Sequence, residues 1–247
     1  METSFLRDAI DRIVGLAAPY TMEANGHTFC SKALVEVKAD EYAPTAYEVD
    51  TLDALVKLIL TEGLTLGRRL YVRVDSARKV TVTTTYNNGE LRNPYLRFPL
   101  YEAVSDVPGV TIGNLMSQER AIVELQSLYG ATPDRDYLLD LLSRIDVNEG
   151  VSSVDNGVTQ EVNVRTGAVL KQATPVRPIV QLQPYRTFLE VEQPVSDFLL
   201  RVSKEGEPTL FEADGGAWKL EAKRSIAAYL AEKLADQVEH GDVVVLV

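Results

Sequence analysis

Short runs in which apolar and polar residues alternate limit the fold of this chain more than any other feature. Residues 68–76 (RRLYVRVDS) and 79–86 (KVTVTTTY) alternate with a period of two and are rich in β-branched side chains. This pattern predicts strands with one buried face. Asn25-Gly26 lies between two shorter alternating runs, which indicates a hairpin. The sequence therefore predicts sheets joined largely by tight turns.

Helix signals interrupt these strands. Thr51, Ser117 and Thr132 each precede a run with helical spacing of apolar residues, and Pro133 suits the first helical position. A long helix is predicted from about residue 218 to 238, followed by the apolar strand VVVLV at 243–247. The predicted fold class is α+β, with a mainly antiparallel sheet, several packed helices and a long C-terminal helix before a short strand.

Composition favours one globular domain. The chain has 247 residues, of which 45% are hydrophobic and 25% charged. We predict a single domain over 1–247; a subdivision into a helix/sheet portion, 1–148, and a β-meander plus C-terminal helix, 149–247, stays open. The single cysteine, Cys30, excludes an internal disulfide. Without a signal segment or an 18-residue apolar run, we expect a cytoplasmic protein that does not enter membranes.

The formal net charge of −11 limits the partners. It disfavours a protein that covers nucleic acid with much of its surface, because each phosphate contact requires a cation. A local basic groove is still compatible with this charge. Nucleic-acid contact is therefore expected to be weak and sensitive to salt.

The residues that usually carry catalysis are scarce. The only histidines are His27 and His240, which leaves too few ligands for most zinc sites and too few bases for most catalytic triads. No phosphate-binding glycine motif occurs. Asp214 with Glu221-x-Lys223 has the residue types of a magnesium nuclease, but a helix would point Glu221 and Lys223 about 200° apart. We predict no metal, no cofactor and no enzymatic activity.

The segment PYRTFLEVEQPVSDFLLRVSKEG, residues 184–206, has the densest set of paired polar residues. It predicts two strands joined at Pro194, with Arg186 and Glu190 on one face of the first. Two interpretations stay open: a charged ladder that sets strand register, or a site where arginines bind a phosphate or carboxylate beside a stacked planar base. The candidate ligand-binding residues are Tyr185, Arg186, Glu190, Arg201, Asp214 and Trp218.

The same region carries a family resemblance. The segments PYRTFLEVEQPVSDFLLRV and EADGGAWKLEA, with weaker similarity in DNGVTQEVNVRTG and QERAIVELQSLYG, resemble the YfdQ-like family of uncharacterised bacteriophage and prophage proteins of unknown function. The resemblance is strongest over Asp155–Leu230. It implies a phage gene product made in the bacterial host cytoplasm, and it assigns no catalytic residue.

These observations favour a non-enzymatic phage protein that binds or sequesters a host protein or a small nucleotide signal, as a counter-defence factor does. A homo-oligomer is expected, because the apolar strand at 243–247 presents an edge that needs a partner. One alternative is an accessory factor of phage DNA replication or recombination with local nucleic-acid contact. A second is a structural protein of the virion, and a metal-dependent enzyme comes last.

Overall fold

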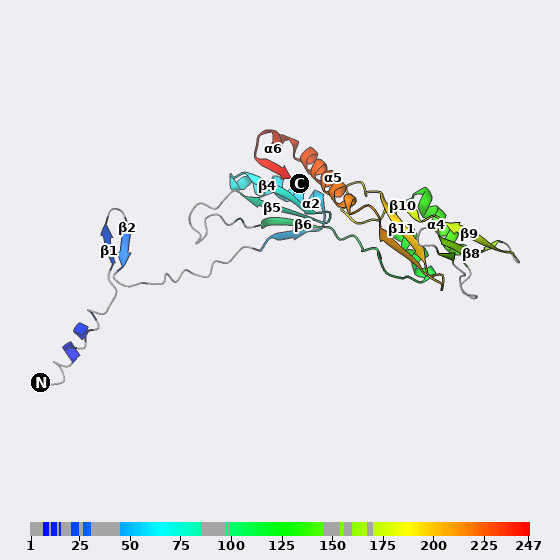
Figure 1. Cartoon of the computed structure of the whole chain (residues 1–247). Helices are drawn as coiled ribbons and strands as arrows, with labels where there is room; N and C mark the ends of the chain where they lie inside the picture. The colour runs from blue at the N-terminus through cyan, green and yellow to red at the C-terminus, as the bar shows by residue number, and fades with distance from the viewer. Residues whose placement is uncertain are drawn as a thin grey trace. The chain divides into compact units, whose positions relative to one another are not determined.

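The computed structural model describes residues 7–9, 11–13, 15, 21–24, 27–30, 45–84, 97, 99–145, 154–155, 160–166 and 170–247. The chain divides into two units, Met1–Tyr42 and Ala43–Val247 (Figure 1). The first unit contains a short helical stretch and the antiparallel hairpin of β1 (Thr21–Ala24) and β2 (His27–Cys30). The predicted turn at Asn25-Gly26 lies outside the described residues, although the two strands beside it pair as expected.

A mixed five-stranded sheet is the first part of the second unit. Its spatial order is β13-β4-β5-β6-β3. The strands are β3 (Tyr47–Val49), β4 (Leu70–Ser76), β5 (Lys79–Thr84), β6 (Pro99–Val104) and β13 (Val243–Leu246). The two outer pairs, β13 with β4 and β3 with β6, are parallel, whereas β4–β5 and β5–β6 are antiparallel.

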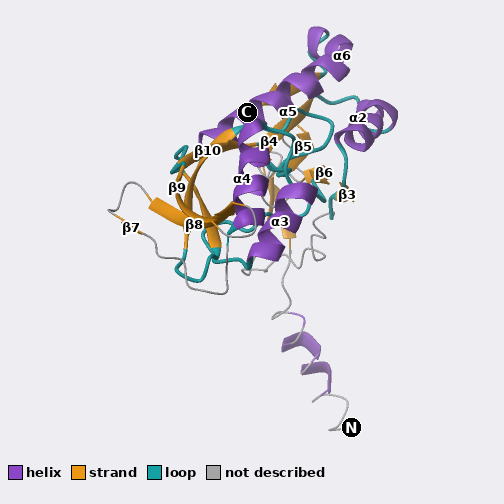
Figure 2. Ribbon diagram, turned by 90° about the vertical axis from the view of Figure 1, so that its right-hand side faces the viewer, coloured by secondary structure: helices purple, strands orange, loops and turns teal. Residues whose placement is uncertain are grey.

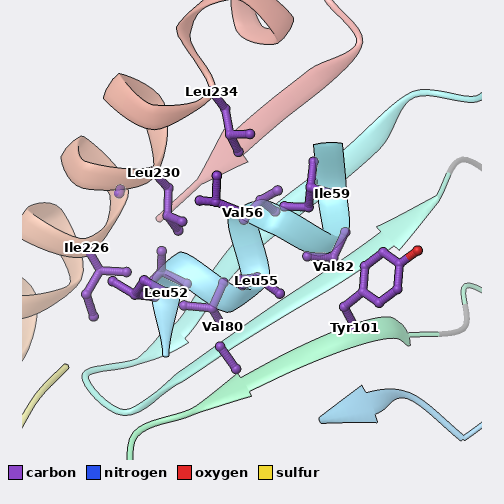
Figure 3. Close-up of a cluster of buried hydrophobic side chains, with 14 of the residues drawn as sticks. Leu52, Leu55, Val56, Ile59, Val80, Val82, Tyr101, Ile226, Leu230 and Leu234 are labelled. Atoms are coloured by element: carbon purple, nitrogen blue, oxygen red, sulfur yellow. The ribbon is translucent and has the colours of Figure 1, made fainter. Parts of the chain in front are cut away.

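Two helices cover one face of this sheet. Helix α2 (Leu52–Thr61) begins where the Thr51 hydroxyl accepts a hydrogen bond from the Ala54 amide at 3.2 Å, and a short 3₁₀ turn (Gly63–Leu66) follows it. Helix α5 (Ala217–Lys233) packs beside it. Figure 3 shows the side chains of α2 lying between α5 and the alternate residues of the strands. The predicted alternation of β4 and β5 is confirmed, since Leu70, Val72, Val80 and Val82 are fully buried.

The C-terminal helix is not continuous as predicted. Leu234 leaves helical geometry (φ −112°, ψ 25°) and directs its side chain into the core, where it is fully buried. A separate short helix, α6 (Ala235–Glu239), follows it. Strand β13 then returns to pair with β4, so the last segment of the chain completes a sheet built from the first half. This pairing crosses the subdivision near residue 148 that the sequence left open.

Two small antiparallel sheets form the rest of the second unit. They are β10-β11-β12 (Ile179–Leu182, Ser196–Val202 and Pro208–Glu212) and β7-β8-β9 (Val154–Asp155, Gln160–Thr166 and Leu170–Val176). Helices α3 (Gln118–Ser127) and α4 (Pro133–Arg144) lie side by side, and α4 packs against β8 and β10 (Figure 2). Ser117 and Thr132 cap these helices as predicted.

The α+β class is therefore confirmed. Most ladders between described strands are antiparallel, the exceptions being the two outer pairs of the five-stranded sheet. Among the described helices, none is both long and apolar enough to cross a membrane.

Ile226 tests how strongly α5 contributes to the core, because its side chain is fully buried. Ile226→Ala should lower the free energy of unfolding by about 2–5 kcal/mol, measured by chemical denaturation, since it leaves a cavity in a packed interior. Leu220→Ala on the same helix is the control, because Leu220 is 48% exposed and its loss should stay within about 0.5 kcal/mol. Equal effects of the two changes would contradict this account of the core.

Candidate functional site

The predicted strand at 187–191 is wrong. Residues 183–195, here called the bridging loop, connect β10 to β11 without joining a sheet. The alternating pattern misled the prediction, because it reports which side chains are buried and not where the backbone hydrogen bonds go. In this loop the buried Gln193 supplies the partners that a neighbouring strand would provide.

The side-chain amide of Gln193 organises the bridging loop. Its Oε1 accepts hydrogen bonds from the amides of Arg186 and Thr187 at 2.9 and 3.1 Å. Its Nε2 donates to the carbonyl of Phe188 at 2.9 Å. A buried backbone group without a partner costs free energy, so this one side chain satisfies three of them.

Four residues of the loop attach it to elements on both sides. Phe188 is 1% exposed and belongs to the core of the five-stranded sheet, while the Thr187 hydroxyl donates to the Ala77 carbonyl at 2.5 Å. Glu190 Oε1 accepts from the Leu52 amide at 2.7 Å, at the N-terminus of α2. The Tyr185 amide donates to the carbonyl of Leu128, just after α3, at 2.9 Å. The loop thus joins the five-stranded sheet and α2 to the end of α3.

Arg186 lies in the interior. It is 6% exposed, and its guanidinium lies 3.7 Å from the centroid of the Trp218 ring. It donates to Glu212 Oε1 at 3.3 Å and to the hydroxyl of Ser196. Trp218 Nε1 donates to the same Glu212 oxygen at 2.9 Å. Burial lowers the pKa of Arg186 to about 10, against the opposing effect of Glu212, so the group stays charged at neutral pH.

Asp214 fixes the position of Trp218. Its carboxylate accepts hydrogen bonds from the amides of Gly216 and Trp218, at 2.9 and 3.2 Å, at the start of α5. Gly215 and Gly216 have φ values of 63° and 82°, a region that favours glycine. The chain therefore turns sharply into α5 and places the Trp218 ring against Arg186.

The six predicted site residues do not form one cluster. Arg186, Asp214 and Trp218 lie together as an interior assembly. Arg201 is separate, because alternation along β11 places it on the opposite face from Ser196 and Phe198, which contact Arg186. The predicted Arg186–Glu190 face is also wrong: Glu212 pairs with Arg186, whereas Glu190 caps α2.

Tyr185 and Glu190 line a surface hollow of about 610 Å³. A second hollow of about 480 Å³ adjoins it and shares Asp50, Ser105 and Asp106. We call the two hollows together the acidic groove. Its polar and exposed apolar residues are Tyr47, Glu48, Asp50, Thr51, Ser105, Asp106, Pro108, Ser127, Tyr185, Leu189 and Glu190.

The parallel pairing of β3 with β6 creates this groove. Val49 lies opposite Ala103, so the carboxyl ends of both strands meet at one edge of the sheet. Asp50 directly follows β3, and Asp106 lies two residues after β6. The carboxyl edge of parallel strands is the common position of ligand sites in α/β sheets.

The groove is lined by several carboxylates. Glu48, Asp50 and Asp106 have no hydrogen bond or ion pair from their side chains to the described residues. Among those residues, no lysine or arginine lines either hollow. Several carboxylates that line one hollow attract cations more strongly than a lone surface charge does.

Ser105 adds a polar group inside the groove. The residue is 4% exposed and lines both hollows. Its backbone is fixed from behind, since Arg78 Nη2 donates to the carbonyls of Ser105 and Val107 at 3.1 and 2.6 Å.

Leu189 and Tyr185 give one end of the groove an apolar wall. They are 70% and 36% exposed, beside Val107, Pro108 and Leu128 of the same hollow. The groove therefore combines carboxylates, hydroxyls and an apolar surface. Sequence reasoning missed Asp50, Ser105 and Asp106, because about fifty residues separate the strands that bring them together; the only local signal was a polar residue after each short strand.

The described residues contain no group of three or more histidine, cysteine, aspartate or glutamate side chains that could hold a metal ion. His27 and Cys30 both lie on β2. Glu221 and Lys223 lie within α5, as the helical pattern predicted. Comparisons of the chain with protein-family models, with curated proteins and with solved structures found no match.

Arg186 tests whether the interior assembly is scaffold. Arg186→Ala should lower the free energy of unfolding by about 1–3 kcal/mol, because it removes the hydrogen bonds to Glu212 and Ser196 from a buried place. Arg73→Ala is the matched control, since Arg73 is 64% exposed in its ion pair with Asp75 and such pairs contribute at most about 1 kcal/mol. Thermal and urea unfolding measure both. An unchanged stability for Arg186→Ala would show that the assembly is not part of the scaffold.

Proposed function

We propose that this protein is a non-enzymatic binding protein whose acidic groove holds a positively charged segment of a partner protein. The observation that carries the proposal is that Asp50 and Asp106 line both hollows, with Glu190 in the first and Glu48 in the second, and that no described lysine or arginine lines either. A lysine or arginine side chain of the partner supplies the missing counter-charge. Its apolar neighbours suit the wall formed by Leu189 and Tyr185.

The negative charge of the groove distinguishes between three classes of partner: a protein, a small nucleotide signal and DNA. Phosphates of a nucleotide or of nucleic acid would approach three carboxylates there, which costs free energy at short range. The uncovered face of the five-stranded sheet does carry cations, but Arg73 pairs with Asp75 at 2.5 Å and Lys79 with Glu102 at 2.7 Å. A protein partner is therefore favoured over a small nucleotide signal and over DNA.

The chemistry of the groove supports binding instead of catalysis. Among the described residues no histidine lines either hollow, so no imidazole is placed there to serve as general base for Ser105. A serine nucleophile requires such a base. The phage context implied by the YfdQ-like resemblance makes a protein of the bacterial host the partner, bound or sequestered in the host cytoplasm as part of counter-defence.

The experiment is a selection from a random heptapeptide library against the full-length protein, followed by fluorescence polarisation with the enriched peptides. We expect peptides with lysine or arginine next to a large apolar residue. Asp50→Asn/Asp106→Asn should weaken binding by at least about tenfold, equivalent to about 1.4 kcal/mol. The affinity of the wild type should also fall as salt rises, because exposed charges are screened.

Glu161→Gln/Glu205→Gln is the matched control, because it removes the same charge from exposed positions that line neither hollow. It should bind like the wild type, and all three proteins should unfold at similar temperatures. Enrichment of acidic peptides, or full affinity in Asp50→Asn/Asp106→Asn, would refute the proposal. Salt-resistant, submicromolar binding of single-stranded or duplex DNA would instead support the replication-accessory alternative.

A further inference from the structure

Strand β13 forms one edge of the five-stranded sheet. It pairs with β4 on one side, and no described strand pairs with it on the other. Backbone N–H and C=O groups along such an edge form hydrogen bonds with water or with another strand.

The direction of the free groups follows from the parallel ladder. The Leu70 amide donates to the Asp242 carbonyl at 2.8 Å, so the backbone of Asp242 faces β4. Because backbone groups alternate sides along a strand, those of Val244 and Leu246 also face β4. The N–H and C=O groups of Val243 and Val245 therefore point away from the sheet.

This edge lacks the features that normally prevent strand pairing. The segment 243–247 contains no charged residue and no proline. Leu246 and Val247 are 42% and 57% exposed, and Val238 of α6, which packs beside β13, is 38% exposed. The opposite edge, β3, has only three residues and carries the exposed Glu48. Charge protects natural edges, so Glu48 protects β3, whereas β13, which has four residues, carries no charge.

We propose that β13 pairs antiparallel with β13 of a second copy of this chain, which joins two five-stranded sheets across a two-fold axis. With Val245 opposite Val245 of the second copy, Val243 lies opposite Val247. In this register no charged side chain of one strand lies opposite a charged side chain of the other, although each copy has a net charge of −11. A strand that pairs with its own copy forms a closed, isologous dimer, the commonest kind of homo-oligomer.

The second copy is favoured over a strand of another protein because the edge is complementary to itself and offers no side chain that selects a different sequence. The groove lies at the β3 edge, at the other end of the sheet order. The dimer therefore leaves both grooves accessible. Peptide binding and dimerisation are independent properties, so failure of one leaves the other standing.

The test is analytical ultracentrifugation of the full chain across micromolar concentrations. We expect a species of twice the chain mass of 27.3 kDa that dissociates on dilution. Leu246→Lys should shift it to the monomer mass, because it places two lysines near the two-fold axis. Leu60→Lys is the control, since Leu60 is 41% exposed on α2, and it should remain dimeric.

A second variant tests the backbone pairing itself. Val245→Pro removes an outward-facing N–H without removing a hydrogen bond to β4, and it should also give monomer. Amide hydrogen exchange should show Val245 protected in the wild type and exposed to exchange in Leu246→Lys, with circular dichroism unchanged. A wild type that sediments as monomer throughout, or a dimer that persists in both variants, would overturn the proposal. So would a fast-exchanging Val245 amide in a wild-type dimer.

Discussion

The hydrogen bonds of one buried amide, that of Gln193, hold together the part of the molecule on which the rest depends. They fold the bridging loop so that Phe188 enters the core of the five-stranded sheet while Arg186 stacks on Trp218 at the start of α5. Glu190 of the same loop accepts the first amide of α2. One irregular segment thus sets the positions of both helices that cover the sheet. An isolated buried arginine would be costly, but stacking and two hydrogen bonds offset part of its desolvation.

The same loop determines the charge of the groove. A helix N-terminus carries partial positive charge and would normally offset a nearby carboxylate. Here Glu190 occupies that position on α2, together with the Thr51 hydroxyl. Asp50 and Asp106 line the same hollow and share the partial positive charge of this helix terminus with Glu190, while Arg78 binds the carbonyls on either side of Asp106. The anchoring of the loop thus adds the Glu190 carboxylate to the groove.

Local patterns predicted the elements well, and long-range pairing explains what they missed. Thr51, Ser117 and Thr132 cap helices as expected, because a cap involves residues three positions apart. Alternation identified β4 and β5 correctly, yet the same signal at 187–191 belongs to a loop stabilised by Gln193. Two of the six predicted site residues, Tyr185 and Glu190, line the groove, whereas Arg186 lies in the interior. Nothing local indicated that β3 pairs with β6, which is what brings Asp50 and Asp106 together.

The backbone of the groove is preformed, which lowers the number of contacts that a ligand needs in order to bind. Arg78 fixes the carbonyls of Ser105 and Val107, and the cap of α2 fixes Thr51, so the backbone beside Asp50 and Asp106 does not have to be ordered on binding. Association costs include the ordering of side chains and loops at the interface, and a preformed site avoids much of that cost. A short cationic segment that reaches Asp50 and Asp106 therefore retains most of its electrostatic attraction as affinity. A flexible acidic tail of equal charge would bind the same segment more weakly.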